Sequence, residues 1–278
     1  MDNFEGRVAA ITGAGSGIGR ALAIELAKRG THLALSDVNA DGLAETVADC
    51  EVGGIKVTTQ VLDVSDREAF EAWAAQVVED HGKVNMIFNN AGVALGAKIE
   101  TMSYEDFEWL MNINFWGVVY GTKSFLPYLK ESGEGHIINI SSVFGLFSVP
   151  TQSAYNAAKF AVRGFTDALR MELELDDCGV SCTTIHPGGI KTNIARSARV
   201  DSSISIEDAG GPTIGDQFDK IAMTSPKKAA RQILTAVERD KRRALIGPDA
   251  KVLDFVARLP AAVMQSVLVR ISSKRGLW

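Results

Sequence analysis

Short runs of apolar and β-branched residues alternate along the chain with longer segments in which apolar residues recur every three or four positions. The short runs are typical of buried strands, and the longer segments are typical of amphipathic helices. Regular alternation of the two is typical of a parallel sheet with helices on both faces. The pattern therefore predicts an α/β protein with a doubly wound parallel sheet of about seven strands.

The elements follow from the same pattern. Strands are predicted over residues 7–12, 32–36, 56–61, 84–88, 135–141, 180–185 and 244–246. Helices are predicted over residues 17–29, 40–50, 66–80, 103–130, 153–176 and 226–238, the last with Ser225 as its cap and Pro226 in its first turn. No Pro- or Ser-rich linker divides these elements, so we expect one domain over residues 1–278.

Two segments fall outside the alternation. Residues 188–224 contain several glycines and no clear period, and a structureless loop of this length in a compact domain usually has a function, so we interpret it as a lid over the substrate. Residues 249–278 form a helical extension with an apolar stripe broken at Pro260. We expect the stripe to pack on the core or on another subunit; closure of a neighbour's substrate pocket and attachment to a membrane surface remain open. The stripe comprises Val252, Val256, Leu259, Val263, Val267 and Ile271, and the nearby cations are Arg270, Lys274 and Arg275.

Composition narrows the class of partner and the compartment. The 29 Lys and Arg against 34 Asp and Glu leave a net charge of −5, which argues against nucleic-acid binding. Three unevenly spaced cysteines, Cys50, Cys178 and Cys182, indicate reduced thiols rather than a disulfide framework or a metal site. The N-terminus lacks the features of a signal peptide, and no apolar run is long enough to span a membrane. We expect a cytoplasmic protein.

The first predicted strand ends in a glycine-rich turn that leads directly into a helix. The turn reads Gly13-x3-Gly17-x-Gly19, with Ser16 and Ile18 inside it. Glycines there let the backbone approach a pyrophosphate, and the helix N-terminus offers free N–H groups and a positive dipole end. The strand-turn-helix context therefore predicts dinucleotide binding on a Rossmann-like sheet.

Asp37 ends the second predicted strand, 18 residues beyond Gly19. An acidic side chain at about this offset meets the hydroxyls of the adenosine ribose and repels a 2′-phosphate. The next residue is Val38, which cannot neutralise such a phosphate. The residue therefore favours NAD over NADP, although an ordinary capping role for Asp37 at the next helix remains open.

Tyr155 and Lys159 lie four residues apart and hence on one face of a helix. A phenol ionises near pH 10, so bringing its pKa to about 7 requires about 4 kcal/mol, close to what one cation at about 4 Å provides at an effective dielectric of about 20. The positive ring of an oxidised nicotinamide could add to this effect. The pair is thus suited to a tyrosinate base at neutral pH.

Together these motifs resemble the short-chain dehydrogenase/reductase family over about residues 6–248. The resemblance rests on the glycine turn, Asp63-Val64, Asn89-Asn90-Ala91-Gly92, Asn114, Ser141-Ser142, Tyr155-x3-Lys159 and Pro187-Gly188-x3-Thr192. It implies a nicotinamide-dependent oxidoreductase and, by its distance from the tyrosine, points to Ser142 rather than Ser141 as the catalytic serine.

The resemblance also implies a role for each residue. Tyr155 would exchange the proton, Ser142 would hydrogen-bond the substrate oxygen, Lys159 would lower the tyrosine pKa and hold the nicotinamide ribose, and Asn114 would anchor a water linking Lys159 to solvent. The other expected cofactor contacts are Asp63 and Val64 at the adenine, Asn90 and Gly92 on the adenosine side, and Pro187, Gly188, Ile190 and Thr192 at the carboxamide.

The substrate and assembly are predicted more coarsely. Phe144, Leu146, Phe147 and Val149 lie where similar enzymes line the substrate pocket, which favours a hydrophobic secondary alcohol or its ketone or aldehyde; among them we place Phe144 and Phe147 at the substrate with Ser142 and Tyr155. Packing beneath the lid is the alternative role for these residues. The resemblance implies a homotetramer or homodimer formed through the long helices that hold Asn114 and Tyr155. Two rival functions remain, an NADPH-dependent carbonyl reductase and a non-catalytic module that senses the cofactor.

Overall fold

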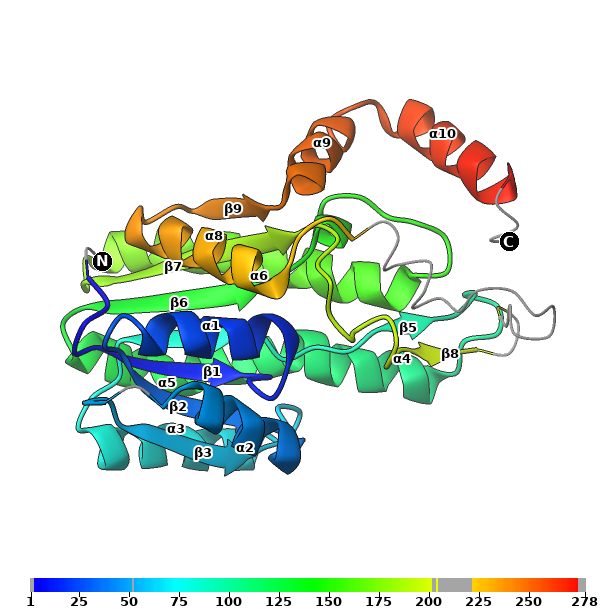
Figure 1. Cartoon of the computed structure of the whole chain (residues 1–278). Coiled ribbons are helices and arrows are strands. Elements are labelled where there is room, and N and C mark those ends of the chain that lie inside the picture. The colour runs from blue at the N-terminus through cyan, green and yellow to red at the C-terminus, as the bar shows by residue number, and fades with distance from the viewer. Residues whose placement is uncertain (1–2, 52, 202–203, 205–221, 275–278) are drawn as a thin grey trace.

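The computed structural model describes residues 3–51, 53–201, 204 and 222–274. Its centre is a seven-stranded parallel sheet in the order β3-β2-β1-β4-β6-β7-β9 (Figure 1). The strands are β1 (Val8–Thr12), β2 (His32–Asp37), β3 (Val57–Val61), β4 (Met86–Asn89), β6 (Gly135–Ile140), β7 (Val180–Pro187) and β9 (Arg243–Ile246). The predicted α/β fold is therefore confirmed. The strand order reverses between β1 and β4, and in such sheets ligands bind beyond the carboxyl ends of the strands at that point.

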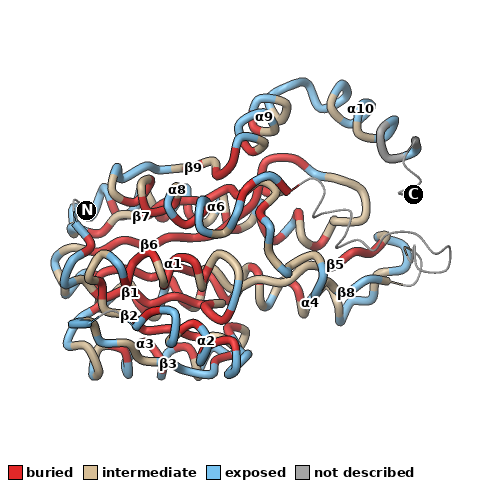
Figure 2. Tube along the Cα trace, viewed as in Figure 1, coloured by how far each residue is buried: buried red, intermediate tan, exposed pale blue. Residues whose placement is uncertain are grey.

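Helices cover both faces of the sheet. On one face lie α1 (Gly17–Ala27), α2 (Ala40–Asp49) and α8 (Pro226–Glu238), and on the other lie α3 (Arg67–His81), α5 (Gly117–Glu131) and α6 (Ser153–Asp176). Each face has its own apolar core: Leu22, Leu26 and Ile233 belong to the first, and Phe70, Trp73 and Phe125 to the second. Figure 2 shows the inner strands as the most deeply buried part of the chain, whereas β3 at the edge of the sheet is partly exposed. No helix among the described residues is both long and apolar enough to cross a bilayer.

The long helix predicted over residues 103–130 is in fact three segments. α4 (Tyr104–Met111) passes into the π-helical turn η1 (Asn112–Trp116) and then into α5. A π turn inserts one extra residue into the helical ladder and often marks a functional position. Apolar periodicity could not reveal it, because one inserted residue barely disturbs the apolar stripe.

A second, two-stranded parallel sheet was not predicted. β5 (Leu95–Gly96) pairs with β8 (Arg199–Val200), and the Arg199 guanidinium lies 3.6 Å from the centroid of the Trp109 ring on α4. The interpretation of residues 188–224 as structureless is therefore wrong for its first part, because backbone pairing orders it. The remainder of that segment, residues 202–203 and 205–221, lies outside the described residues.

The C-terminal extension consists of two helices separated at Pro260, where the predicted stripe is broken. The stripe itself does not pack on the core of this chain, because Val252, Val263 and Val267 are exposed. They are α9 (Pro248–Val256) and α10 (Ala261–Lys274), and both lie beyond the β9 edge of the sheet (Figure 1). Leu253, Ala257, Met264 and Leu268 pack against a cluster formed by the turn η2 (Val143–Gly145) and the loop that follows it. The extension thus covers the segment that the sequence assigns to the substrate. Arg275, one of the cations named for the tail, lies outside the described residues.

Candidate active site

The glycine turn lies between the end of β1 and the start of α1. Gly13 has φ = 64°, and a Cβ atom on it would lie 2.8 Å from Cα of Ala91, so only glycine fits. Ser16 is the exposed N-cap of α1, and its side chain caps no backbone N–H there. The first N–H groups of α1 are thus free to bind an anion. The turn fits a pyrophosphate, as the sequence predicts.

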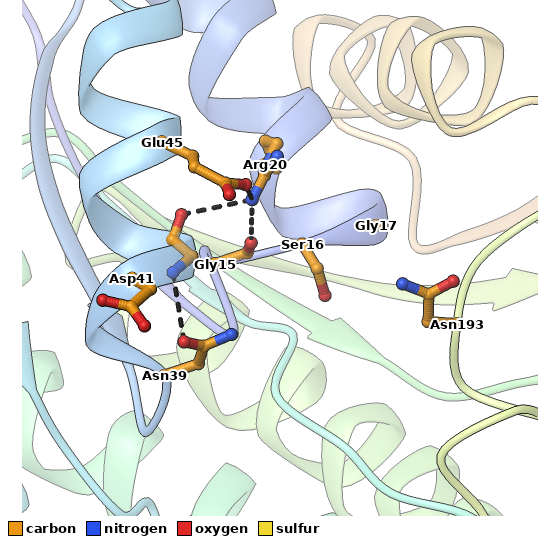
Figure 3. Close-up of a pocket in the computed structure, with 9 residues that line it drawn as sticks. Gly15, Ser16, Gly17, Arg20, Asn39, Asp41, Glu45 and Asn193 are labelled. Atoms are coloured by element: carbon orange, nitrogen blue, oxygen red, sulfur yellow. Dashed lines mark hydrogen bonds and ion pairs between the residues drawn. The ribbon is translucent and has the colours of Figure 1, made fainter.

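Polar side chains line a cavity of about 390 Å³ beside this turn (Figure 3). The Arg20 guanidinium donates to the carbonyl oxygens of Gly15 and Gly42 and forms an ion pair with Glu45 at 2.7 Å. Its charge is therefore largely satisfied by the protein. Sequence reasoning missed Arg20, because nothing in its position shows that it would fold back on the turn.

Asp37 ends β2 at the same cavity edge. Its Oδ2 accepts a hydrogen bond from the Gly15 N–H at 2.8 Å, and Oδ1 accepts one from the Asn39 N–H at 2.9 Å. Asn39, not Asp37, caps the helix α2 through the Gly42 N–H. The alternative that Asp37 is the helix cap is therefore wrong, and the carboxylate lies against the glycine turn, where an adenosine ribose would lie.

The residues after β4 support the glycine turn from beneath. Asn90 donates from Nδ2 to the carbonyl of Thr12 at 2.8 Å, and the Thr12 hydroxyl accepts from the N–H groups of Asn90 and Ala91 at 3.0 Å each. The Asn90 side chain is thus committed to the turn. Asp63 is exposed, with Oδ1 bonded to Ser65, whereas Val64 is buried against Gly117.

The ends of β6 and α6 bring Ser142, Tyr155 and Lys159 together at the carboxyl edge of the sheet. The Ser142 side chain lies close enough to Tyr155 to lower the pKa of its phenol, and the Lys159 Nζ lies 5.6 Å from the centroid of the Tyr155 ring. Ser141, by contrast, donates its hydroxyl to the backbone carbonyl of Lys159 and so ties β6 to α6. The geometry favours Ser142 over Ser141 as the residue facing the tyrosine.

Burial dominates the electrostatics of this group. Desolvation raises the pKa of Tyr155 to about 12, against the smaller effect of the hydrogen bond from Ser142, and it lowers the pKa of Lys159 to about 8. The Lys159 ammonium donates to the carbonyl of Ile140 at 3.0 Å. In this arrangement Lys159 by itself does not bring the phenol pKa near 7, because burial is the largest cause acting on that pKa.

Asn114 lies in the π turn and is fully buried. Its Oδ1 accepts from the Val93 N–H and its Nδ2 donates to the Val93 carbonyl, both at 2.8 Å. A Cβ atom on Gly92 would lie 3.1 Å from that Oδ1 and 3.7 Å from the Lys159 Nζ. Asn114, Gly92 and Lys159 are therefore neighbours, and both polar atoms of the asparagine hold the strand-end backbone that carries Gly92.

His186 supports Ser142 from behind, a role that sequence reasoning missed. It is fully buried, and its Nδ1 lies 2.8 Å from the carbonyl oxygen of Ser142. A carbonyl can only accept, so Nδ1 carries the proton. Burial lowers the pKa of His186 to about 4, and the ring stays neutral at physiological pH. The only hint of this role in the sequence was that His186 directly precedes Pro187-Gly188.

The turn after β7 crosses toward the glycine-rich turn. Pro187 ends the strand, Gly188 donates to the Ile246 carbonyl at 2.9 Å, and Ile190 is buried. The Thr192 methyl lies 3.1 Å from where a Cβ of Gly17 would be. Of the residues predicted at the carboxamide, Thr192 thus lies next to the glycine turn.

The predicted substrate segment forms an apolar wall at Tyr155. The Phe144 ring meets the Tyr155 ring edge to face, with centroids 6.2 Å apart, and Phe147 meets Phe144 in the same way at 5.6 Å. Leu146 and Phe147 are both buried against the C-terminal extension, so the alternative of packing fits Phe147 as well as Leu146. Phe144 is the aromatic ring directly beside the tyrosine.

Asn156 fixes this wall to α6 and was not singled out from the sequence. It is 4% exposed, donates to the carbonyls of Phe144 and Phe147, and accepts from the Val149 N–H at 3.2 Å. A buried amide that satisfies three backbone groups holds a loop in one conformation. Its position between Tyr155 and Lys159 in the sequence could have drawn attention to Asn156. Its hydrogen-bond partners could not be predicted from the sequence.

Comparisons with known proteins agree with this geometry. A family model described as short chain dehydrogenase matches residues 7–203. SadH of Mycobacterium tuberculosis, an inferred oxidoreductase, is 47% identical over 279 residues, covering 100% of this chain and 99% of that protein. Estradiol 17-beta-dehydrogenase 11 of Macaca fascicularis is 36% identical over 203 residues, covering 73% of this chain and 68% of that protein.

A solved structure supports the same assignment. The short chain dehydrogenase/reductase of Burkholderia phymatum in complex with NAD superposes with a TM-score of 0.82 at 32% identity, covering 92% of this chain and 94% of that one. The sheet order, the glycine turn and the Ser142, Tyr155 and Lys159 group are thus accompanied by similarity along nearly the whole chain. The chain belongs to the short-chain dehydrogenase/reductase family of nicotinamide-dependent oxidoreductases.

Proposed function

We propose that the protein is an NAD(H)-dependent oxidoreductase that interconverts a hydrophobic secondary alcohol and its ketone or aldehyde. The observation that carries the proposal is the convergence of Ser142, Tyr155 and Lys159 beside an apolar wall and a dinucleotide-type turn. A bound nicotinamide supplies or accepts the hydride. The chain's own residues position the substrate oxygen and move its proton.

The proton step takes place at the Tyr155 hydroxyl. In the reductive direction the phenol gives its proton to the substrate oxygen as negative charge develops there, and in the oxidative direction the phenolate takes the proton back. The Ser142 hydroxyl donates a hydrogen bond to the same oxygen. The carbonyl of Ser142 is held by His186, which fixes the serine in place.

Lys159 favours the phenolate electrostatically. With a pKa of about 8, the buried ammonium stays mostly protonated at neutral pH. It therefore opposes the effect of burial on the Tyr155 pKa, and the positive charge of an oxidised nicotinamide nearby acts in the same direction. We infer that the tyrosine reaches a useful pKa in the oxidative direction only when both charges are present.

The wall beside the tyrosine supports an apolar substrate. Phe144 and Phe147 present aromatic faces and edges without charge, and aliphatic residues from α9 and α10 surround them. A relative named for a steroid dehydrogenase is consistent with a hydrophobic alcohol. The described start of the segment 188–224 follows β7, and its role as a lid over the substrate stays a prediction.

The preference for NAD rests on Asp37. The comparisons support a nicotinamide cofactor and leave the choice between NAD and NADP to the residues around the adenosine ribose. A carboxylate held there by two backbone N–H groups repels a 2′-phosphate, and Arg20 is occupied by Glu45 and two carbonyls. In the alternative, an NADPH-dependent carbonyl reductase, a cation would have to bind the 2′-phosphate. Arg20 could do so only by leaving Glu45 and the two carbonyls.

Asp37→Ala combined with Val38→Arg is expected to shift the ratio of NADH to NADPH affinity by about 100-fold toward NADPH, because it exchanges a repulsive charge for an attractive one. Fluorescence titration with both nucleotides measures this ratio. The control is Asp41→Ala, which removes a carboxylate that lines the same cavity without contacting Gly15. An unchanged ratio in the double variant would contradict the role given to Asp37.

The proposed function is tested by cofactor binding followed by turnover. Purified protein is titrated with NADH and NADPH, and a panel of aliphatic, aromatic and steroid secondary alcohols is then followed at the absorbance of the reduced nicotinamide. Binding of NADH with turnover of apolar alcohols supports the proposal. Tight binding without turnover on any member of a broad panel would instead favour the cofactor-sensing module.

A homodimer or homotetramer is proposed through α6. Its catalytic face is buried, whereas the opposite face carries an exposed apolar stripe with helical spacing that includes Phe160, Met171 and Leu175, the last 87% exposed. Ala157, Gly164 and Ala168 complete the stripe. Small and large residues in such a row allow two copies of the helix to pack closely.

Phe160→Glu is expected to convert the assembly to a species of lower mass, because it introduces a charge at the centre of the proposed contact. Light scattering measures the mass, and NADH binding checks that the opposite face of α6 is intact. The matched variant Val252→Glu places the same charge on the exposed surface of α9. Dissociation by Val252→Glu alone would show that the extension, not α6, forms the interface.

A further inference from the structure

Asp249 lies at the start of the C-terminal extension, in the first turn of α9, and reaches back to the turn after β7. Its Oδ2 accepts a hydrogen bond from the Gly189 N–H at 2.6 Å. The same carboxylate fills the space where Gly188 would carry a Cβ atom, so no larger residue fits at position 188. The extension and the Gly188–Gly189 turn are therefore in direct contact.

Backbone hydrogen bonds support the rest of this turn: the Gly188 N–H donates to the Ile246 carbonyl at the end of β9, and the other bonds come from residues 191, 223 and 224. The Gly189 carbonyl accepts from the N–H groups of Met223 and Thr224 at 3.1 and 3.2 Å, and the Lys191 N–H donates to the Thr224 carbonyl at 2.9 Å. Ile190 and Thr224 form a β-bridge. Asp249 is thus a side chain that connects the turn to the C-terminal extension, in addition to these backbone bonds.

A contribution to folding stability does not by itself explain why a carboxylate is present at position 249. Oδ1 of Asp249 is buried and finds no hydrogen-bond partner among the described residues, and neither does the nearby hydroxyl of Thr224. Both atoms lie within 2.8 Å of the point where a Cβ of Gly247 would be. An unsatisfied buried acceptor is destabilising, so the residue has a cost that its contact with Gly189 must offset.

We propose that Asp249 is a positioning residue that holds the Gly188–Gly189 turn in the conformation that receives the nicotinamide half of the cofactor. The C-terminal extension would thereby set nicotinamide affinity as well as lining the substrate wall. The inference rests on the proposed function, because it assumes that the turn lies at the nicotinamide. A substitution at Asp249 is then expected to weaken binding of the nicotinamide half of the dinucleotide and to leave binding of the adenosine half unchanged.

The experiment compares NADH with ADP-ribose, which carries the adenosine and pyrophosphate groups and lacks nicotinamide. Calorimetric affinities are measured for the wild-type chain, Asp249→Ala and Asp249→Asn. We expect Asp249→Ala to weaken NADH binding by about 10-fold or more, as for loss of a hydrogen bond to a charged group, and to leave ADP-ribose binding unchanged. Asp249→Asn should recover most of the NADH affinity, since its amide oxygen can still accept from Gly189.

Asp254 provides a matched control on the same helix. It is 9% exposed and forms ion pairs with Arg243 and Arg258 at 3.0 and 2.9 Å, away from the Gly188–Gly189 turn. Asp254→Ala should lower the melting temperature without changing the ratio of the two affinities. Should Asp249→Ala not fold, Asp249→Ser, whose shorter side chain cannot span the same distance, carries the same expectation.

The outcomes separate this inference from the proposed function. Equal weakening of NADH and ADP-ribose, or no weakening of either, in the folded Asp249 variants would overturn the positioning role. A change in the affinity ratio caused equally by Asp254→Ala would also overturn it, because a general loss of stability would then account for the result. A wild-type chain that binds ADP-ribose but neither NADH nor NADPH would refute the proposed function itself.

Discussion

Replacing Tyr155 with phenylalanine is expected to lower kcat by about 10²–10⁴-fold, the usual contribution of a positioned general acid or base. The variant keeps the ring that meets Phe144 edge to face and loses the hydroxyl that lies near Ser142. The wall and the fold should therefore persist, and NADH affinity should stay nearly constant. Turnover of the preferred alcohol and fluorescence titration with NADH measure the two quantities.

Tyr104→Phe is the matched control for this variant. Tyr104 is 86% exposed at the start of α4 and has no part in the proposed chemistry. The Tyr104→Phe variant should turn over the preferred alcohol at the wild-type rate. Activity that survives in Tyr155→Phe would show that the proton is transferred by another group, whereas equal loss of NADH binding would assign the tyrosine to cofactor binding rather than to the proton step.

The free energy of unfolding is expected to fall by about 2 kcal/mol for each pH unit between about pH 6.5 and pH 5, about 1 kcal/mol from each of two buried histidines. Burial lowers the pKa of both His136 and His186 from 6.5 to about 4. His136 bonds the Thr183 hydroxyl, which itself donates to the Lys241 carbonyl, so the imidazole is the donor and is neutral.

The direction of the effect follows from which state binds protons first. In the unfolded chain both imidazoles titrate at about 6.5, whereas in the folded protein they stay neutral down to about pH 4. Stability is therefore complete above pH 6.5, is lost as the pH falls toward 4, and changes no further from these groups below that value. The charge of Asp240 raises the pKa of His136 and the charge of Arg170 lowers it. Burial is therefore the main cause of the lowered pKa of His136.

Urea unfolding at a series of pH values measures this slope. His186→Asn places an amide donor where Nδ1 donates to the Ser142 carbonyl and removes the titrating ring, so it should halve the slope. His136→Gln should do the same for the bond to Thr183. His81, whose pKa burial also lowers, leaves a smaller residual slope in the double variant. A slope unchanged in both single variants would contradict the assignment.

Hydrophobic periodicity was sufficient for the main elements of the fold. All seven strands of the large sheet lie within a few residues of their predicted ranges, and α6 begins and ends at the predicted residues. Parallel strands buried on both faces produce continuous apolar runs, so the pattern is strong. The pair β5 and β8 was missed because each strand has two residues, too few for any period.

The candidate site was predictable where one motif occupies one turn of the chain. Gly13, Gly17 and Gly19 act through local backbone geometry, and Tyr155 and Lys159 share a helix face because of their spacing. Asp249 and His186 could not be found in this way. Each acts on a backbone group 60 or 44 residues away, and only the sheet brings the partners together.

The sequence by itself determined the class of fold, the position of the glycine turn and the residues able to exchange a proton, because these depend on local spacing and on residue chemistry. The tertiary structure decided which serine faces Tyr155, how far burial shifts the pKa of that tyrosine and of Lys159, and which segment covers the residues predicted to meet the substrate. Those properties depend on desolvation and on contacts between distant segments. They arise only once the sheet has assembled and water has left the site.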